Sequence, residues 1–176
     1  MANPRVRIRE TTILTKPGLE ALCQVLIDCV EGGASVSFML PMTHSKAESF
    51  WQGVSDSAAR GERVVYLAED ADGIVGTTQL VWAQAENQPH RADVAKMLVH
   101  RRGRRQGVGA ALLAAAEQGA LQRGKTLLVL DTVTGSDGDR LYAANGWKRC
   151  GEIPNYALWP DGRLCPTTVF YKSLHR

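Results

Sequence analysis

The sequence has no long apolar run. Its longest one, residues 110–116, is far shorter than the ~18 residues that a membrane-spanning helix needs. The first ten residues, MANPRVRIRE, contain no apolar segment of the kind that marks an export signal. We therefore expect a chain that neither crosses a membrane nor is exported by such a signal.

Cysteine is scarce as well. The four cysteines form no Cys-x-x-Cys pair and have no histidine at zinc-finger spacing: Cys23, Cys29, Cys150 and Cys165. This usage argues against a disulfide framework and a zinc finger, and it predicts buried thiols in a reducing compartment. We expect a cytoplasmic protein with no metal site.

Length and composition are those of an ordinary globular domain. The chain has 176 residues, and a usual domain has ~100 to 200, so we expect one domain over residues 1–176. Hydrophobic residues make up 44% and charged residues 22%, which disfavours disordered and fibrous chains.

The net charge of +3 conceals an uneven distribution. Residues 96–125 contain seven basic side chains and one acidic one, so this segment carries +6 and the rest of the chain −3. A basic focus of this kind is typical of an anion site or of a nucleic-acid-binding patch. Composition alone leaves both possibilities open.

Hydrophobic periodicity and turn residues predict an alternating order of elements. Helices are expected over 18–30, 43–60 and 108–122, and around residues 141–143. Strands are expected over 5–9, 63–69, 74–83, 93–100, 126–131, 147–153, 156–159 and 167–172, and the 126–131 run, being continuously apolar, should be buried on both faces. The order β-α-α-β-β-β-α-β-α-β-β predicts an α/β (α+β) domain, with a mixed central sheet flanked by helices.

A glycine-containing turn follows the strand that ends near His100. Gly107 and Gly109 leave backbone N–H groups free to approach an anion at the start of the next helix, an arrangement suited to a phosphate or diphosphate. The spacing does not fit a Walker loop, because neither Gly103 nor Gly107 precedes Gly-Lys at the required distance. A dinucleotide fingerprint would need a third glycine where Leu112 stands.

The pattern [QR]-x-x-G-x-[GA], met at every position from Arg104 to Gly109, resembles the acetyl-coenzyme A loop of the GCN5-related N-acetyltransferase (GNAT) family. The family follows this loop with a long helix, a buried strand and a helix carrying Leu-Tyr before Gly-Phe or Gly-Trp. Leu141-Tyr142 and Gly146-Trp147 supply those pairs here. The family fold is the mixed sheet already expected.

Further short blocks resemble the tabtoxin-resistance acetyltransferase subgroup of that family. They are spread over nearly the whole chain: residues 32–36, Asn87 with Arg91-Ala92, 130–132, 135–136, 151–154, 160–164 and 166–167. The resemblance implies an acetyl-CoA-dependent N-acetyltransferase whose acceptor is a small primary amine, with a β-lactam amino acid of the tabtoxinine type as the finer expectation.

The resemblance also implies where the cofactor binds. The main chain of Leu98 and Val99 should pair with the pantetheine arm, and the loop should hold the phosphates through Arg104, Arg105, Gln106, Gly107, Val108, Gly109 and Ala110. Many members of the family have an asparagine seven residues before the tyrosine. This chain has Gly135 there, which leaves Ser136 as a substitute.

Two side chains are expected to carry the chemistry. By resemblance the Tyr142 hydroxyl lies near the sulfur, and a phenol of pKa ~10 is protonated at neutral pH and can act as the general acid. Asp131 ends an apolar strand and is expected to accept or orient the acceptor's amine proton. A carboxyl of ordinary pKa, ~3.9, is a weak base, so either burial raises its pKa or the group only orients the ammonium. Plain ring packing for Tyr142 and turn capping for Asp131 are the alternatives.

The acceptor pocket is expected to involve the loop between the first two helices, two strands and a late loop. The residues are Ser35, Val36, Phe38, Gln79, Arg91 and Tyr156, with Arg91 as a cation able to hold a carboxylate. We expect a small-molecule partner and neither nucleic acid nor membrane; the oligomeric state is left open. The competing hypotheses are a nucleic-acid-binding module that uses the arginine run and a sensor that binds coenzyme A without transfer.

Overall fold

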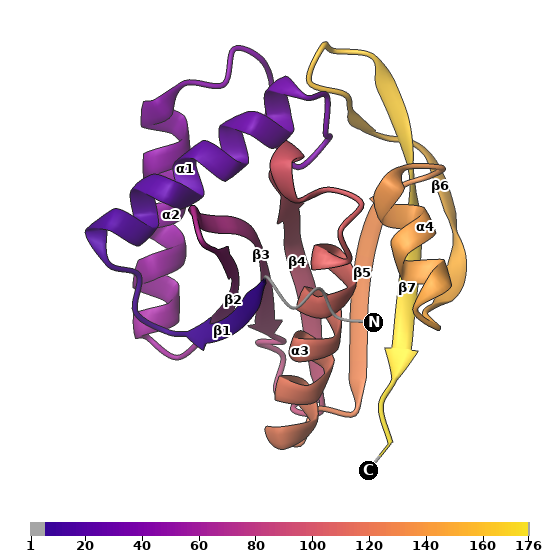
Figure 1. Cartoon of the computed structure of the whole chain (residues 1–176). Coiled ribbons are helices and arrows are strands. Elements are labelled where there is room, and N and C mark those ends of the chain that lie inside the picture. Colours follow the sequence, from indigo (N-terminus) through magenta and orange to yellow (C-terminus); the bar gives the residue numbers. More distant parts are fainter. Residues whose placement is uncertain (1–5, 176) are drawn as a thin grey trace.

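The computed structural model describes residues 6–175 and contains seven strands and four α-helices in that range (Figure 1). Their order is the predicted one. The elements are β1 (Arg7–Thr11), α1 (Lys16–Glu31), α2 (His44–Ala59), β2 (Arg63–Asp70), β3 (Gly73–Trp82), β4 (Arg91–Val99), the 3₁₀ turn η1 (Arg101–Gly103), α3 (Val108–Gln122), β5 (Leu127–Val133), α4 (Asp137–Ala144), β6 (Lys148–Leu158) and β7 (Leu164–Ser173).

Three details differ from the sequence-based prediction. The runs 147–153 and 156–159 form one strand, β6, interrupted by register shifts against β7. Strand β5 continues past Asp131 to Val133, and it is not buried on both faces: Leu128 and Leu130 are buried, whereas Asp131 is exposed. The first strand begins at Arg7; Arg5, included in the prediction, lies outside the described residues.

The seven strands form one mixed sheet in the order β1-β2-β3-β4-β5-β7-β6. The parallel pair at its centre, β4 and β5, is joined only at its start, where Arg91–Asp93 pair with Leu127–Val129. Beyond Asp93 the two strands diverge, as Figure 1 shows. Main-chain groups along the rest of this edge of β4 therefore lack a neighbouring strand.

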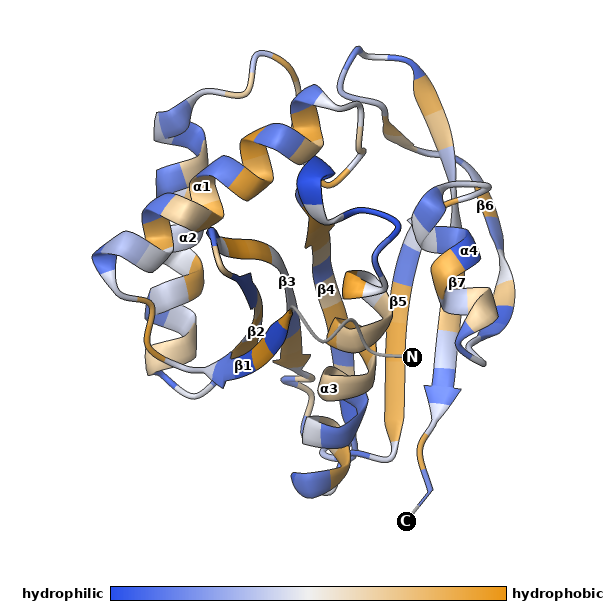
Figure 2. Cartoon of the chain, viewed as in Figure 1, coloured by the Kyte–Doolittle hydropathy of each residue, from blue (hydrophilic) through white to orange (hydrophobic). Residues whose placement is uncertain are grey.

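Helices cover both faces of the sheet and enclose two apolar clusters. Helix α3 packs over Val64, Tyr66 and the buried side of β5, while α1 and α2 cover Val65 and Leu67 on the other face. In α1, apolar and polar residues alternate around the helix (Figure 2), so that one side packs on the sheet and the other faces solvent. Adjacent residues of β2 thus point to opposite cores, as the alternation of a strand requires.

Strand β4 contains a bulge that reverses which side chains face each helix layer. Thr77 pairs with Leu98 and Gln79 with Ala95, so Thr78 alone faces two residues of β4, and one of them, Lys96, has a φ of 51°. Residues on either side of a bulge switch faces. Val94 accordingly packs in the α3 cluster and Leu98 in the cluster under α1 and α2, although they are four positions apart and would share a face in a regular strand.

Two surface properties complete the description. No helix within residues 6–175 has the length and apolar character needed to cross a membrane. Three of the four cysteines are buried, but Cys150 is exposed because it lies on the edge strand β6, so the prediction of four buried thiols is wrong at that position.

Gly119 of α3 sits where the sheet leaves no room for a side chain. A Cβ there would lie 1.9 Å from the Tyr66 hydroxyl, which donates a hydrogen bond of 2.8 Å to Glu10. We predict that Gly119→Ala lowers the melting temperature by several degrees, because Tyr66 must leave its hydrogen bond and its packing.

Gly53, on the exposed side of α2, is the matched control, because a Cβ added there meets no atom within 4 Å. Gly53→Ala should raise the melting temperature slightly, since alanine is the better helix former. Equal effects of the two substitutions in differential scanning calorimetry would show that the contact with Tyr66 does not limit this position.

Candidate functional site

A cavity of about 640 Å³ opens where β4 and β5 diverge. Its walls come from the loop between α1 and α2, from β4 and β5, from α4 and from the β6–β7 hairpin. Of the residues predicted to form the site, it brings together Ser35, Val36, Phe38, Asp131, Tyr142 and Tyr156.

Asp131 and Tyr142 approach the cavity from different layers. Tyr142 belongs to α4 and is buried among the α3 cluster, its ring 5.8 Å from that of Trp147 and 5.9 Å from that of Phe170. Burial raises the pKa of its hydroxyl, and the negative charge of Asp131 raises it further. The phenol therefore holds its proton at neutral pH.

The Asp131 side chain is exposed and accepts a hydrogen bond of 2.9 Å from the Thr167 hydroxyl. It does not cap the following turn. That task falls to Ser136, which accepts from the Asp139 N–H, and to Asp139, which accepts from the Gly135 N–H at 2.7 Å. The exposure of Asp131 favours an orienting role over that of a base activated by burial.

Two charged residues of the cavity, Asp93 and Lys96, were missed at the sequence level. Asp93 pairs in register with Val129, two residues before Asp131, so both carboxylates lie on the same face of the sheet. Burial raises the pKa of Asp93; the Arg91 charge opposes this and that of Asp131 adds to it. The sequence did contain a signal for these two residues, because each is a charged residue in a mostly apolar strand. Lys96, for example, lies within the run VAKMLV.

The structure places two predicted acceptor residues away from the cavity wall. Gln79 is fully buried, and its side-chain amide oxygen accepts a hydrogen bond of 2.9 Å from the Arg63 guanidinium. Arg91 stands at the start of β4, before the strands diverge, and its guanidinium lies 3.5 Å from Asp93. Neither side chain lines the cavity, and the cation that does is Lys96.

The start of α3 differs from the starts of the other α-helices. In α1, α2 and α4 a hydroxyl caps the first turn, from Thr15, Thr43 and Ser136 respectively. The N-cap of α3 is Gly107, which has a φ of 78° and no side chain to accept from the first turn. The main-chain N–H groups of Val108, Gly109 and Ala110 are thus left without a side-chain cap, as an anion site at a helix N-terminus requires.

Most of the arginines around this turn are held by acidic residues from elsewhere in the chain. Arg101 pairs with Asp28 of α1, and Arg102 pairs with Asp70 at the end of β2. Burial alone would raise the pKa of Asp28, but the hydrogen bonds from Arg101 and the charges of His100 and Arg101 lower it. The hydrophilic segment between β4 and α3 (Figure 2) is therefore far less positive in space than along the sequence.

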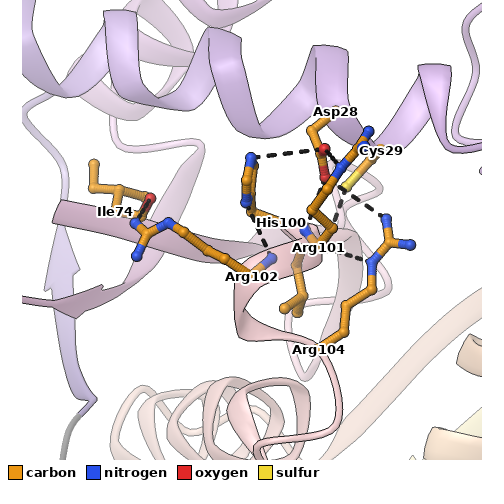
Figure 3. Close-up of polar contacts among 8 residues, drawn as sticks. Asp28, Cys29, Ile74, His100, Arg101, Arg102 and Arg104 are labelled. Carbon is orange, nitrogen blue, oxygen red and sulfur yellow. Dashed lines mark hydrogen bonds and ion pairs between the residues drawn. The ribbon is translucent and has the colours of Figure 1, made fainter. Parts of the chain in front are cut away.

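Arg104 is turned toward α1 (Figure 3). Its Nε donates to the Val99 carbonyl at 3.2 Å, and its Nη2 lies 3.8 Å from the Asp28 carboxylate. The Val99 carbonyl, predicted to pair with pantetheine, thus already has a donor within the protein. Leu98 is buried beneath α1 and α2, and Gln106 donates to the Arg102 carbonyl at 2.6 Å. Arg105 is exposed, with a φ of 59°.

Comparison with known proteins identifies the class of this fold. Residues 61–149 match the acetyltransferase (GNAT) domain family. A ribosomal-protein-alanine N-acetyltransferase from Brucella melitensis has a similar structure, with a TM-score of 0.77, 23% identity, and coverage of 96% of this chain and 99% of that one. The yncA protein from Salmonella typhimurium, solved with its cofactor acetyl-CoA, has a TM-score of 0.77 and 16% identity, over 98% of this chain and 95% of that one. A GCN5-related N-acetyltransferase from Kribbella flavida has a TM-score of 0.79 and 20% identity, over 97% of this chain and 98% of that one.

The chain belongs to the GNAT family, because the matched domain spans half of its length. It is an acetyl-CoA-dependent acetyltransferase. The residues present fit that cofactor: the first turn of α3 has no side-chain cap, and the unpaired edge of β4 leads directly to it. Within residues 6–175 no cluster of three or more metal-binding side chains is found.

We predict that Gly107→Val abolishes acetyl-CoA binding. The backbone at Gly107 is left-handed, a conformation that valine resists, so the loop must rearrange and its N–H groups lose their common direction. Isothermal titration calorimetry of the folded variant is the measurement.

Gly61→Val provides a matched control, because Gly61 has a similar φ of 74°, meets no atom within 4 Å of an added Cβ and lies outside the cavity wall. It should lose stability while retaining wild-type affinity. Undiminished binding by Gly107→Val would show that the loop does not hold the cofactor.

Proposed function

We propose that this protein transfers the acetyl group of acetyl-CoA to a primary amine of a small molecule. Acetyl-CoA supplies the acetyl group as an activated thioester. Within this proposal the main chain of residues 98–99 and the loop 104–110 bind the cofactor, with Ser136 as a further contact, and the cavity between β4 and β5 receives the acceptor.

The observation that carries the proposal is a bridge over part of the cavity, made by two segments distant in the sequence. The Ser35 hydroxyl donates a hydrogen bond of 2.7 Å to the Leu158 carbonyl. The Leu40 N–H donates to the Pro160 carbonyl at 3.1 Å. The loop between α1 and α2 is thereby bonded to the β6–β7 hairpin across the site. A cavity partly covered by these two segments favours a small acceptor over the side chain of a folded protein.

The side chains around the cavity supply the groups that acyl transfer to an amine needs. Tyr142 is protonated, so it can give a proton to the departing sulfur. Asp131 and Asp93 place negative charge where an incoming ammonium must be held and relieved of its proton. The raised pKa of Asp93 suits it to accept a proton, and Asp131 then orients the amine.

The finer proposal for the acceptor is a β-lactam amino acid of the tabtoxinine type, which would make the activity a detoxification. Its support is the set of short sequence blocks shared with the tabtoxin-resistance subgroup, together with a cavity that carries both signs of charge. The nucleic-acid-binding alternative loses support from the ion pairs of Arg101 and Arg102.

A screen of thiol release tests the proposed function. The purified protein with acetyl-CoA is mixed with amino acids, polyamines, aminoglycosides and tabtoxinine-like compounds, and products are confirmed by mass spectrometry. We expect N-acetylation of a small primary amine. Acetyl-CoA binding without transfer to any of these, but with transfer to a peptide N-terminus, would overturn the small-molecule assignment; binding without any transfer would favour a sensor.

Tyr142→Phe tests the general acid. It removes only the hydroxyl and keeps the ring packing against Trp147 and Phe170, so kcat should fall by roughly 10²- to 10⁴-fold with little change in acetyl-CoA affinity. Tyr171→Phe, on the neighbouring strand β7 and outside the cavity wall, is the control. Equal turnover by Tyr142→Phe and the wild type would show that the acid lies elsewhere.

A further inference from the structure

Lys96 is directed into the cavity by the bulge of β4. It is one of the two residues opposite Thr78, it has a positive φ, and it lines the cavity. Its neighbours Ala95 and Met97 line the same cavity. A long cationic side chain at an interruption of a central strand is thus placed on the wall that the acceptor must contact.

The amine of Lys96 is partly desolvated and has no acidic partner. Nζ donates to the Ser37 hydroxyl at 2.9 Å, and it lies 6.0 Å from the Phe38 ring centre and 5.7 Å from that of Phe50. Within residues 6–175 no carboxylate oxygen lies within 4.0 Å of it. Burial lowers the pKa of Lys96, Asp131 opposes this shift, and Arg63 adds to it. Desolvation of the ammonium therefore outweighs its favourable interaction with the charge of Asp131.

The cavity therefore has two poles. Asp93 of β4 and Asp131 of β5 form the negative pole, and Lys96 of β4, whose Nζ donates to Ser37 of the α1–α2 loop, forms the positive pole. A ligand that complements both poles carries an ammonium and an anionic group on one small framework. A simple amine would satisfy the carboxylates and leave the desolvated cation without a hydrogen-bonded anion, which costs binding energy.

We propose that Lys96 binds a carboxylate of the acceptor, and that the acceptor is consequently an amino acid and not a simple amine. The inference rests on the proposed function; it names the residue that holds the acceptor's carboxylate and supports an amino-acid acceptor independently of the shared sequence blocks. The Ser37 hydroxyl is placed to donate a second hydrogen bond to the same carboxylate. Lys96 takes the role that the sequence suggested for Arg91, whose guanidinium faces Asp93 instead.

The test compares amino acids with the amines that lack their carboxylate. The pairs are ornithine and putrescine, lysine and cadaverine, and methionine and 3-(methylthio)propylamine, each assayed by thiol release. The wild type should have a higher kcat/KM for at least one amino acid than for its amine, by about 10- to 100-fold, the usual worth of a hydrogen-bonded charge. Lys96→Met should remove that preference through KM, and Lys96→Arg should restore part of it.

Controls separate this inference from the proposed function. Lys148→Met, at an exposed position of β6 outside the cavity wall, should behave as the wild type. Acetyl-CoA affinity measured by calorimetry should be the same for both Lys96 variants, and its absence in the wild type would refute the proposed function itself. With the cofactor bound, a wild type that prefers the amines or acetylates no amino acid overturns the role of Lys96. The role of Lys96 is also overturned if Lys96→Met lowers kcat/KM by the same factor for an amino acid and for the corresponding amine.

Discussion

The divergence of β4 from β5 is the constraint on which the rest of the site depends. Only three residues of β4 pair with β5. Beyond them, the main-chain groups on the facing edges of the two strands would be costly to bury without hydrogen-bond partners. In the proposed function this edge binds the acyl donor. Around the opening lie the groups that the proposed reaction needs: an uncapped helix start, a buried phenol and a pair of carboxylates.

The bulge in β4 is a second feature that shapes the site. It lets one strand contribute to three environments, because Val94 packs toward α3, Leu98 packs toward α1, and Lys96 between them faces the cavity. The same local irregularity therefore shapes both the core and the lining of the cavity. Asp28 and Asp70 hold arginines beside the loop proposed to bind the cofactor, so the loop is held in place without a broad positive surface.

Much of this could be predicted from the sequence, because the relevant signals are local. Threonines and a serine before three helices, glycine before α3 and regular apolar spacing set the order of elements and the bounds of α3, residues 108–122. The proximity of Asp131 and Tyr142 could be expected from the family pattern. The positions of Gln79, Arg91 and Lys96 could not, since the face that each side chain takes depends on the register between β3 and β4. That register is set by packing on both sides of the sheet.

The central claim is that the divergent edge of β4 and the uncapped start of α3 together bind acetyl-CoA. The most direct test is an amide NMR titration of the ¹⁵N-labelled protein with acetyl-CoA. We expect the largest shifts on the N–H groups of Val108, Gly109 and Ala110 and on residues 95–99. Saturable binding that leaves these amides unchanged while others shift would contradict it.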